Sequence, residues 1–389
     1  MHAYPLMRLD DSVLSPKNRK QGFYSVGGKA FNHKLNALTA ATRSGLPVLW
    51  NFNYAAFQEQ CKKPRLGSTP ITDLYKERAL QIRDTYQYVI LAFSGGVDSD
   101  TILHTFIDND IKLDEVWVDF PLSLIEKSNY VLTRDTKPSN MPSEWFLVIK
   151  PALDKLRITN PEIKIHISDS LGSPTDEDNE STICIVSAIS SYNALKRYRH
   201  IKEYTQDLSH HKTVCVVMGH DKPIPTMNGT EFGFSIPDSV TYFKSEQDAR
   251  GLCMVEYFYW TPDFPIIATE QAWRVWDYLN ENPTVRARYL SNVNDRHSYF
   301  GRRTDEGSMS LAVSKICYPN WNTGTHQVDK SGAVRNDQFS SLMYKYRNQR
   351  FFQSWESNLN SITAQVGPHH FDSSGELKRF YNWHRLGYA

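Results

Sequence analysis

The sequence has no long hydrophobic run and few cysteines. No apolar stretch reaches the ~18–20 residues that span a bilayer, and the chain does not begin with a basic segment followed by an apolar one. The five cysteines are odd in number, widely spaced and never form a C-x-x-C pair, which argues against a disulfide framework and a zinc ribbon. These absences predict a soluble protein of the reducing cytoplasm that has no membrane partner.

Neither sign of charge dominates. Lys and Arg number 44, Asp and Glu number 43, and the formal net charge is +1 at pH 7. This balance argues against a surface devoted to nucleic acid, although a local basic groove is compatible with it. Hydrophobic residues make up 40% of the 389 residues and charged residues 22%, a composition typical of a folded protein of two or three domains.

The pattern of apolar residues divides the chain into three parts. Residues 1–70 are expected to form a small α+β module, with a strand over 23–28 and an amphipathic helix over 29–44. Residues 263–389 are expected to form a mostly helical C-terminal region. Residues 71–262 alternate buried strands with helices, which predicts an α/β fold with a parallel sheet and helices on both faces. The strands of this central part are predicted over 88–93, 113–120, 162–167 and 213–218, and its helices over 72–86, 101–108, 143–156 and 183–198.

A glycine-rich turn follows the apolar run at 88–93. It reads Ser94-Gly95-Gly96-Val97-Asp98-Ser99 and leads into a helical pattern. Gly95 and Gly96 permit a tight backbone path and close approach of a ligand. Successive N–H groups, together with the positive end of the following helix, then face an anion. The turn is therefore predicted to bind phosphate.

Side chains of the same turn add hydroxyl and carboxylate groups. Ser94 and Ser99 can donate hydrogen bonds to phosphate oxygens. Asp98 can support Mg²⁺, which favours a carboxylate combined with phosphate oxygens. A Walker-type loop would carry a Lys after its final Gly, and none is present.

S-G-G-x-D-S after an apolar strand resembles the PP-loop motif of the N-type ATP pyrophosphatases. Asparagine synthetase, GMP synthetase, NAD synthetase, argininosuccinate synthetase and the tRNA thiolation enzymes share this motif. The resemblance covers about residues 88–223 and implies an adenine nucleotide alpha hydrolase-like fold with ATP and Mg²⁺ bound at Ser94–Ser99. A looser likeness, at 23–52 and 259–263, is to asparagine-synthetase-like or phosphosulfate-reductase-like PP-loop proteins of large bacteriophages.

The resemblance also assigns roles at the ends of two other strands. Enzymes of the asparagine-synthetase type carry G-x-G-A-D-E where this chain has Gly219-His220-Asp221-Lys222. The correspondence makes Gly219 part of the nucleotide site and Asp221 a second Mg²⁺ ligand. Asp98, Asp221 and Lys222 would then be the catalytic residues, and the Lys222 ammonium would neutralise charge on the phosphates. An ordinary charged turn is the alternative.

The strand that follows the loop helix ends at Val118-Asp119-Phe120. In PP-loop proteins this strand end contacts adenine, mostly through backbone groups, so Val118 and Phe120 are candidate base contacts. Asp119 is a candidate for the ribose or the cosubstrate, and a solvated turn is an equal alternative.

The resemblance implies adenylation of an acceptor oxygen followed by displacement of AMP. Thiolation and phosphosulfate-reductase cysteine motifs and a four-cysteine zinc cluster are absent, which leaves an amine or ammonia as the nucleophile. The chain begins Met1-His2 where glutamine-dependent asparagine synthetases begin Met-Cys, so another source of nitrogen is expected. A small-molecule acceptor is expected. A nucleic-acid or nucleobase substrate, a phosphosulfate-reductase-like nucleotide-binding protein, a non-catalytic ATP binder and a homo-oligomer all stay open.

The segment Val255–Asp263 is aromatic and acidic. A buried strand with a polar exit is the favoured interpretation. A lining for the acceptor pocket is the alternative.

Overall fold

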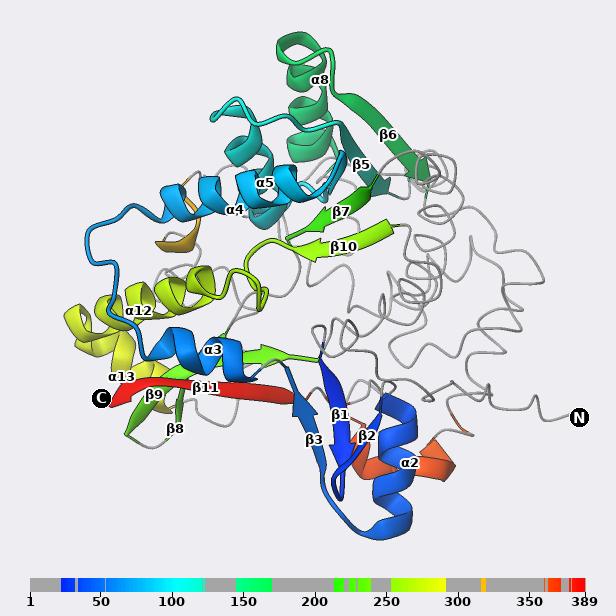
Figure 1. Ribbon diagram of the computed structural model, residues 1–389, viewed down its shortest axis with the longest axis vertical. Helices are drawn as coiled ribbons and strands as arrows, with labels where there is room; N and C mark the ends of the chain where they lie inside the picture. Colours follow the sequence, from blue (N-terminus) through cyan, green and yellow to red (C-terminus); the bar gives the residue numbers. More distant parts are fainter. Residues whose placement is uncertain are drawn as a thin grey trace, which may run out of the picture.

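The computed structural model describes residues 22–31, 34–52, 54–120, 122, 145–169, 213–219, 224–228, 230–238, 253–291, 316–319, 360, 363–371, 378 and 380–388. These residues form three sheets and the helices that pack on them (Figure 1). None of the described helices is long and apolar enough to cross a membrane.

The largest sheet is parallel and has five strands, in the order β10-β7-β4-β5-β6. Its central strands β4 and β7 are continuous apolar runs, and all five side chains of β7 are buried. The predicted parallel α/β sheet is thereby confirmed. The strands are β4 (Tyr88–Ala92), β5 (Glu115–Phe120), β6 (Lys164–Asp169), β7 (Val214–Met218) and β10 (Cys253–Tyr257).

Helices α4 (Ile71–Thr85) and α5 (Val97–Ile107) contact β4 and each other. The predicted helix over 143–156 is seen from Trp145 as a π-helical turn, η2 (Trp145–Ile149), that continues into α8 (Lys150–Thr159). The helix predicted over 183–198, between β6 and β7, lies outside the described residues, and helices on the second face of the sheet remain an expectation.

The N-terminal module contains an antiparallel sheet of order β2-β1-β3, with β1 (Phe23–Val26), β2 (Lys29–Phe31) and β3 (Val48–Asn51). The prediction of a helix from residue 29 is wrong at its start, since α2 spans Lys34–Ser44. Gly27 and Gly28 have φ of +55° and +82° and form a two-residue turn, which pairs Val26 with Lys29 as a hairpin. Helix α3 (Tyr54–Cys61) follows the sheet.

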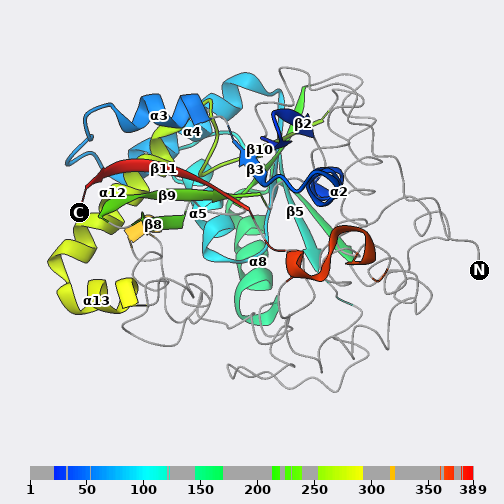
Figure 2. The ribbon, with the colours of Figure 1, turned by 90° about the horizontal axis from the view of Figure 1, so that it is seen from below.

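A third sheet joins parts of the chain that are far apart in sequence. Its order is β11-β9-β8, antiparallel throughout, with β8 (Ile224–Asn228), β9 (Glu231–Pro237) and β11 (Tyr381–Tyr388) side by side (Figure 2). The C-terminal region, expected to be mostly helical, therefore ends in a strand. Its described helices are α12 (Ile266–Glu281), α13 (Pro283–Ser291) and the short η5 (Pro368–His370).

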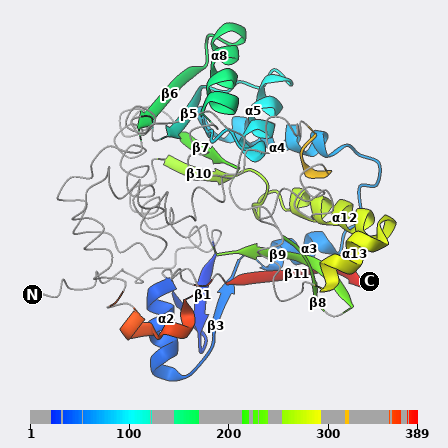
Figure 3. The same ribbon diagram turned by 180° about the vertical axis from the view of Figure 1, so that it is seen from behind.

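Helix α12 packs between the parallel sheet with its helices and the third sheet (Figure 3). It contacts α4 on one side and β8 and β9 on the other. One hydrophobic core extends through these layers and into the N-terminal module. Phe52 of that module, for example, meets Trp260 edge-on at 4.8 Å between ring centroids. The three parts that the sequence separates thus share one interior.

Candidate functional site

The glycine-rich turn connects β4 to α5. Gly95 has φ of +74°, a conformation that L side chains rarely adopt. A Cβ built on Gly95 would lie 2.6 Å from Cγ1 of Ile149, because η2 packs directly on the turn. Backbone conformation and packing therefore both require glycine at this position.

The Ser99 hydroxyl bonds to the backbone at both ends of the turn. The Ser99 hydroxyl donates to the Gly96 carbonyl at 3.0 Å and accepts from the Ser94 backbone N–H at 3.2 Å. Ser99 is buried, whereas Ser94 is exposed. The two predicted phosphate-binding hydroxyls thus differ in position: Ser94 lies at the surface of the turn, and Ser99 shapes it from inside.

Helix α5 begins directly after the turn. Gly96 occupies the N-cap position and has no side chain that could accept hydrogen bonds from the N–H groups of the first turn. Another acceptor can therefore bond to these N–H groups. Asp98 and Asp100 lie in this first turn and are both half-buried. The two carboxylates interact favourably with the positive end of the helix dipole but would repel a phosphate. A cation bound between the carboxylates and the phosphate would remove that repulsion.

The turn lies where the strand order reverses. When β4, β5, β6, β7 and β10 are numbered 1 to 5 in chain order, the sheet reads 3-2-1-4-5 from β6 to β10. The chain continues from β4 to β5 on one side of the sheet and from β7 to β10 on the other, so the strand order reverses between β4 and β7. Open α/β sheets bind ligands in the crevice outside the carboxyl ends of the strands at this point. The predicted phosphate-binding turn leaves β4, and Gly219 leaves β7, so the structure places both at this reversal.

Gly219 lies against Asp98. A Cβ on Gly219 would be 3.0 Å from Cβ of Asp98 and 3.1 Å from its carbonyl carbon. Two segments that are 121 positions apart in sequence therefore meet, as the predicted nucleotide site requires. Asp221 and Lys222 lie outside the described residues, so their roles stay predictions.

The carboxyl end of β5 forms the other side of the turn. Val118 and Phe120 are buried, and the Phe120 ring lies 5.5 Å from the ring of Trp145. Asp119 is half-buried and accepts a hydrogen bond from the Ser168 hydroxyl of β6 at 3.1 Å. Val118 is fully buried and Phe120 nearly so, so their predicted contacts with a base stay predictions. Sequence reasoning missed Trp145 and Ser168, which come from segments without a recognisable motif.

The aromatic segment after β10 is buried. Phe258, Tyr259 and Trp260 are at most 2% exposed, while Asp263 is exposed, so the predicted burial and polar exit are seen, but the strand itself ends at Tyr257. The Tyr259 hydroxyl donates to the backbone carbonyl oxygen of Asp98 at 2.6 Å. Burial, and secondarily the charge of Asp98, raises the pKa of Tyr259 well above its ordinary value, so this hydroxyl remains a donor.

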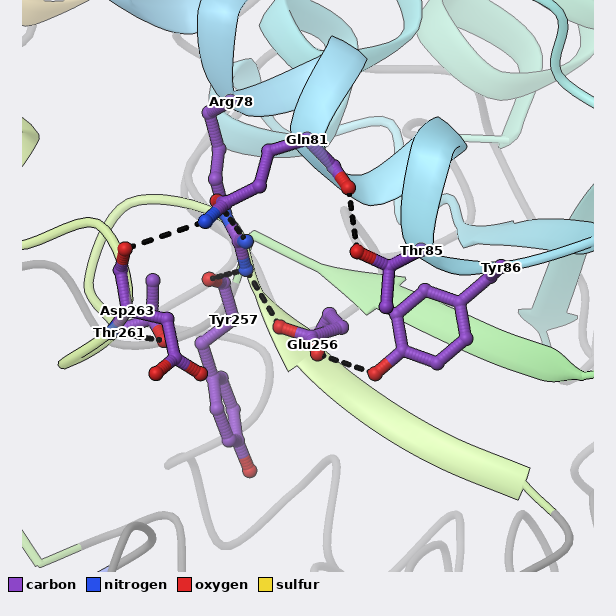
Figure 4. Close-up of polar contacts among 8 residues, drawn as sticks. All are labelled: Arg78, Gln81, Thr85, Tyr86, Glu256, Tyr257, Thr261 and Asp263. Carbon is purple, nitrogen blue, oxygen red and sulfur yellow. Dashed lines mark hydrogen bonds and ion pairs between the residues drawn. The ribbon is translucent and has the colours of Figure 1, made fainter.

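Strand β10 is fastened to α4 by a buried ion pair (Figure 4). One Arg78 guanidinium nitrogen lies 2.6 Å from a carboxylate oxygen of Glu256 and also donates to the Tyr257 carbonyl at 3.1 Å. The Tyr86 hydroxyl donates to the other Glu256 oxygen at 2.6 Å. These bonds fix the strand that delivers Tyr259 to Asp98.

A protein metal site complete in itself is not seen among the described residues, where no three His, Cys, Asp or Glu side chains gather in a group that could hold an ion. Magnesium is commonly held by one or two carboxylates plus substrate phosphates, and Asp98 with its half-buried carboxylate fits that donor set. Asp98 is therefore a candidate for holding a metal together with a phosphorylated ligand.

Comparison with known proteins identifies no relative: no family model, no curated protein and no solved structure matches this chain.

Proposed function

We propose that this chain is an ATP pyrophosphatase-type ligase that splits ATP into AMP and pyrophosphate while it adenylates an acceptor oxygen. The observation that carries the proposal is the turn Ser94–Ser99 at the strand-order reversal, with Gly219 of β7 against Asp98. An adenine nucleotide alpha hydrolase-like arrangement, with the nucleotide across the ends of β4, β5 and β7, is part of the proposal.

Each part of the turn has a role in this proposal. The backbone N–H groups from Gly95 to Asp98 hold phosphate oxygens at the start of α5. The exposed Ser94 hydroxyl donates to the same group. Asp98 would hold Mg²⁺, which when bound would neutralise charge on the phosphates. Asp221 and Lys222, two and three residues beyond Gly219, supply further charge from the end of β7.

The reaction has two displacements. An oxygen of the acceptor, a carboxylate or an amide carbonyl, attacks the α-phosphorus, the bond from that phosphorus to the α–β bridging oxygen breaks, and pyrophosphate leaves with the bond electrons. Ammonia or an amine then attacks the activated carbon and AMP leaves with the former acceptor oxygen. Positioning and charge neutralisation carry such chemistry, so the protein needs no covalent nucleophile of its own.

The proposal is tested by product release from purified protein with Mg·ATP, ammonia and sets of acceptors: amino acids, nucleotides and oligonucleotides. We expect AMP and pyrophosphate in equal amounts with a small-molecule acceptor and ammonia. Pyrophosphate release that requires an oligonucleotide, and that falls steeply as the salt concentration rises, would indicate that the acceptor is a nucleic acid. A wild-type protein that releases no pyrophosphate with any acceptor and binds Mg·ATP no better than the Ser94→Ala variant would reject the proposal.

A further inference from the structure

The hydroxyl of Tyr259 contacts the backbone of the proposed nucleotide site. Tyr259 follows β10, the edge strand next to β7, and its side chain is fully buried. Its hydroxyl donates to the Asp98 carbonyl at 2.6 Å, within the first turn of α5. A carbonyl oxygen has two acceptor positions, so this bond can add to the helical bond from the N–H four residues later.

The neighbours of Tyr259 hold it in place. The Phe258 backbone N–H donates to the Met218 carbonyl at the end of β7, at 3.0 Å. Trp260 stacks on Tyr257 at 4.3 Å and meets Phe52 of the N-terminal module at 4.8 Å. A hydroxyl on such a fixed backbone specifies where the Asp98 carbonyl lies, because buried side chains have few alternative rotamers.

A second buried tyrosine provides a comparison. Tyr75 of α4 packs edge-on against Tyr259 at 5.5 Å. Its hydroxyl donates to the Cys317 carbonyl at 2.5 Å and accepts from the Gln271 amide at 2.9 Å, and neither partner belongs to the glycine-rich turn. The two residues share burial, ring environment and a bond to a backbone carbonyl. They differ in which backbone they hold.

We propose that Tyr259 is a positioning residue that fixes the first turn of α5, and with it the N–H groups and the Asp98 carboxylate that face the nucleotide. This inference rests on the proposed function for its catalytic consequence. Without the Tyr259 hydroxyl, the turn keeps its sequence and its glycines but loses the hydrogen bond to the Asp98 carbonyl. Small displacements of such groups weaken catalysis because productive geometry is narrow.

The test compares Tyr259→Phe with the matched control Tyr75→Phe, each lacking one buried hydroxyl. Amide hydrogen exchange of the peptide covering residues 94–104 reports the order of the turn without any ligand. Affinity for Mg·ATP and the rate of pyrophosphate release report its function. Thermal unfolding of both variants gives the global cost of each deletion.

We expect Tyr75→Phe to lose at least as much global stability as Tyr259→Phe, because the Tyr75 hydroxyl makes two of the hydrogen bonds described and the Tyr259 hydroxyl one. Only Tyr259→Phe should speed exchange at 94–104, by about tenfold, and lower pyrophosphate release by a similar factor with a smaller change in Mg·ATP affinity. Equal exchange in that peptide for both variants would overturn the inference. If Tyr259→Phe alone speeds exchange but wild-type protein neither binds Mg·ATP nor releases pyrophosphate, the proposed function fails, and the catalytic role of Tyr259 fails with it.

Discussion

Gly95 is the residue at which the conformation and the packing of the turn can be separated by experiment. It has φ of +74° and lies under Ile149, whereas Gly67 has φ of +63° and nothing within 4 Å of a built Cβ. Alanine at either position meets the left-handed backbone penalty of about 1–2 kcal/mol. Only the Gly95→Ala substitution also brings a methyl group into collision with a side chain.

We therefore predict that Gly95→Ala lowers the free energy of unfolding by at least about 1 kcal/mol more than Gly67→Ala does. Urea unfolding measures both. Gly95→Ala should also weaken Mg·ATP binding, because relief of the collision shifts the turn. Equal destabilisation in the two variants would show that Ile149 does not restrict this position.

The charge of Asp98 is expected to act on the nucleotide more than on the fold. We predict that Asp98→Asn lowers pyrophosphate release at least about 10²-fold with nearly unchanged thermal stability. Asp73→Asn is the control: Asp73 lies in the first turn of α4, is exposed and should affect only the helix dipole. Comparable activity of the two variants would remove Asp98 from the proposed site.

At the scale of elements, the contact of α4 with β10 depends on the ion pair between Arg78 and Glu256. The guanidinium is 3% exposed and the carboxylate 18%. Removing Arg78 leaves Glu256 without its guanidinium partner in a largely buried place, a change that typically costs 3–5 kcal/mol, and partial exposure favours the lower end. We predict a loss of about 3 kcal/mol for Arg78→Met in denaturant unfolding.

Arg65→Met provides the exposed counterpart. Arg65 pairs with Asp277 through side chains that are 39% and 44% exposed, and such pairs contribute about 0–1 kcal/mol. A loss from Arg78→Met no larger than that from Arg65→Met would show that burial does not strengthen the link between α4 and β10.

Local sequence pattern predicts β4, β5, β6 and β7 to within about three residues. Strands β4 and β7 are largely buried apolar runs bounded by polar turns, whereas apolar and polar residues alternate in β6. The local pattern also predicts the glycine turn, whose chemistry is local. Strands β8, β9 and β11 were missed. Strand β11 pairs Trp383 with Ser235, 148 positions away, and its burial centres on the polar His384, so neither its partner nor its apolar face is evident locally.

The candidate site shows the same division. Ser94, Gly95 and Gly219 could be named from motifs because each belongs to a turn that directly follows an apolar run. Tyr259 could not be assigned its bond to Asp98, because that contact joins residues 161 positions apart. An aromatic run in the sequence indicates burial and leaves the direction of each hydroxyl undetermined.

At the scale of the whole molecule, Asp238 connects the C-terminal part of the chain to the N-terminal module. This buried carboxylate accepts from the Tyr24 hydroxyl at 2.9 Å, lies 2.8 Å from the Lys34 ammonium and accepts from the Phe380 backbone N–H at 3.1 Å. The N-terminal module, the segment after β9 and the approach to β11 therefore meet at one side chain. We expect these parts to unfold together.

His384 makes that unit sensitive to acid. It is fully buried in β11 between the rings of Phe57 and Phe234, and burial lowers its pKa from 6.5 to about 4. As pH falls below 6.5 the unfolded chain binds a proton that the folded protein does not. We therefore expect stability to be lost progressively between pH 6.5 and 4, by a total of about 3 kcal/mol.

We predict that His384→Phe, which suits a slot between two phenylalanines, flattens the dependence of unfolding free energy on pH between about 6.5 and 4.5. Urea unfolding at several pH values measures this slope. An unchanged slope in the variant would place the acid sensitivity on other groups.

The most direct measurement concerns which bond of ATP breaks. Wild-type protein, Ser94→Ala and Asp98→Asn are incubated with Mg·ATP labelled at the α-phosphate, together with ammonia and the acceptor set, and the nucleotides are separated by chromatography. We predict labelled AMP with an equal amount of pyrophosphate from wild type and at least about 10²-fold less from Asp98→Asn. Labelled ADP with inorganic phosphate, or AMP formation that is unchanged in both variants, would contradict the assignment of this turn as an ATP pyrophosphatase site.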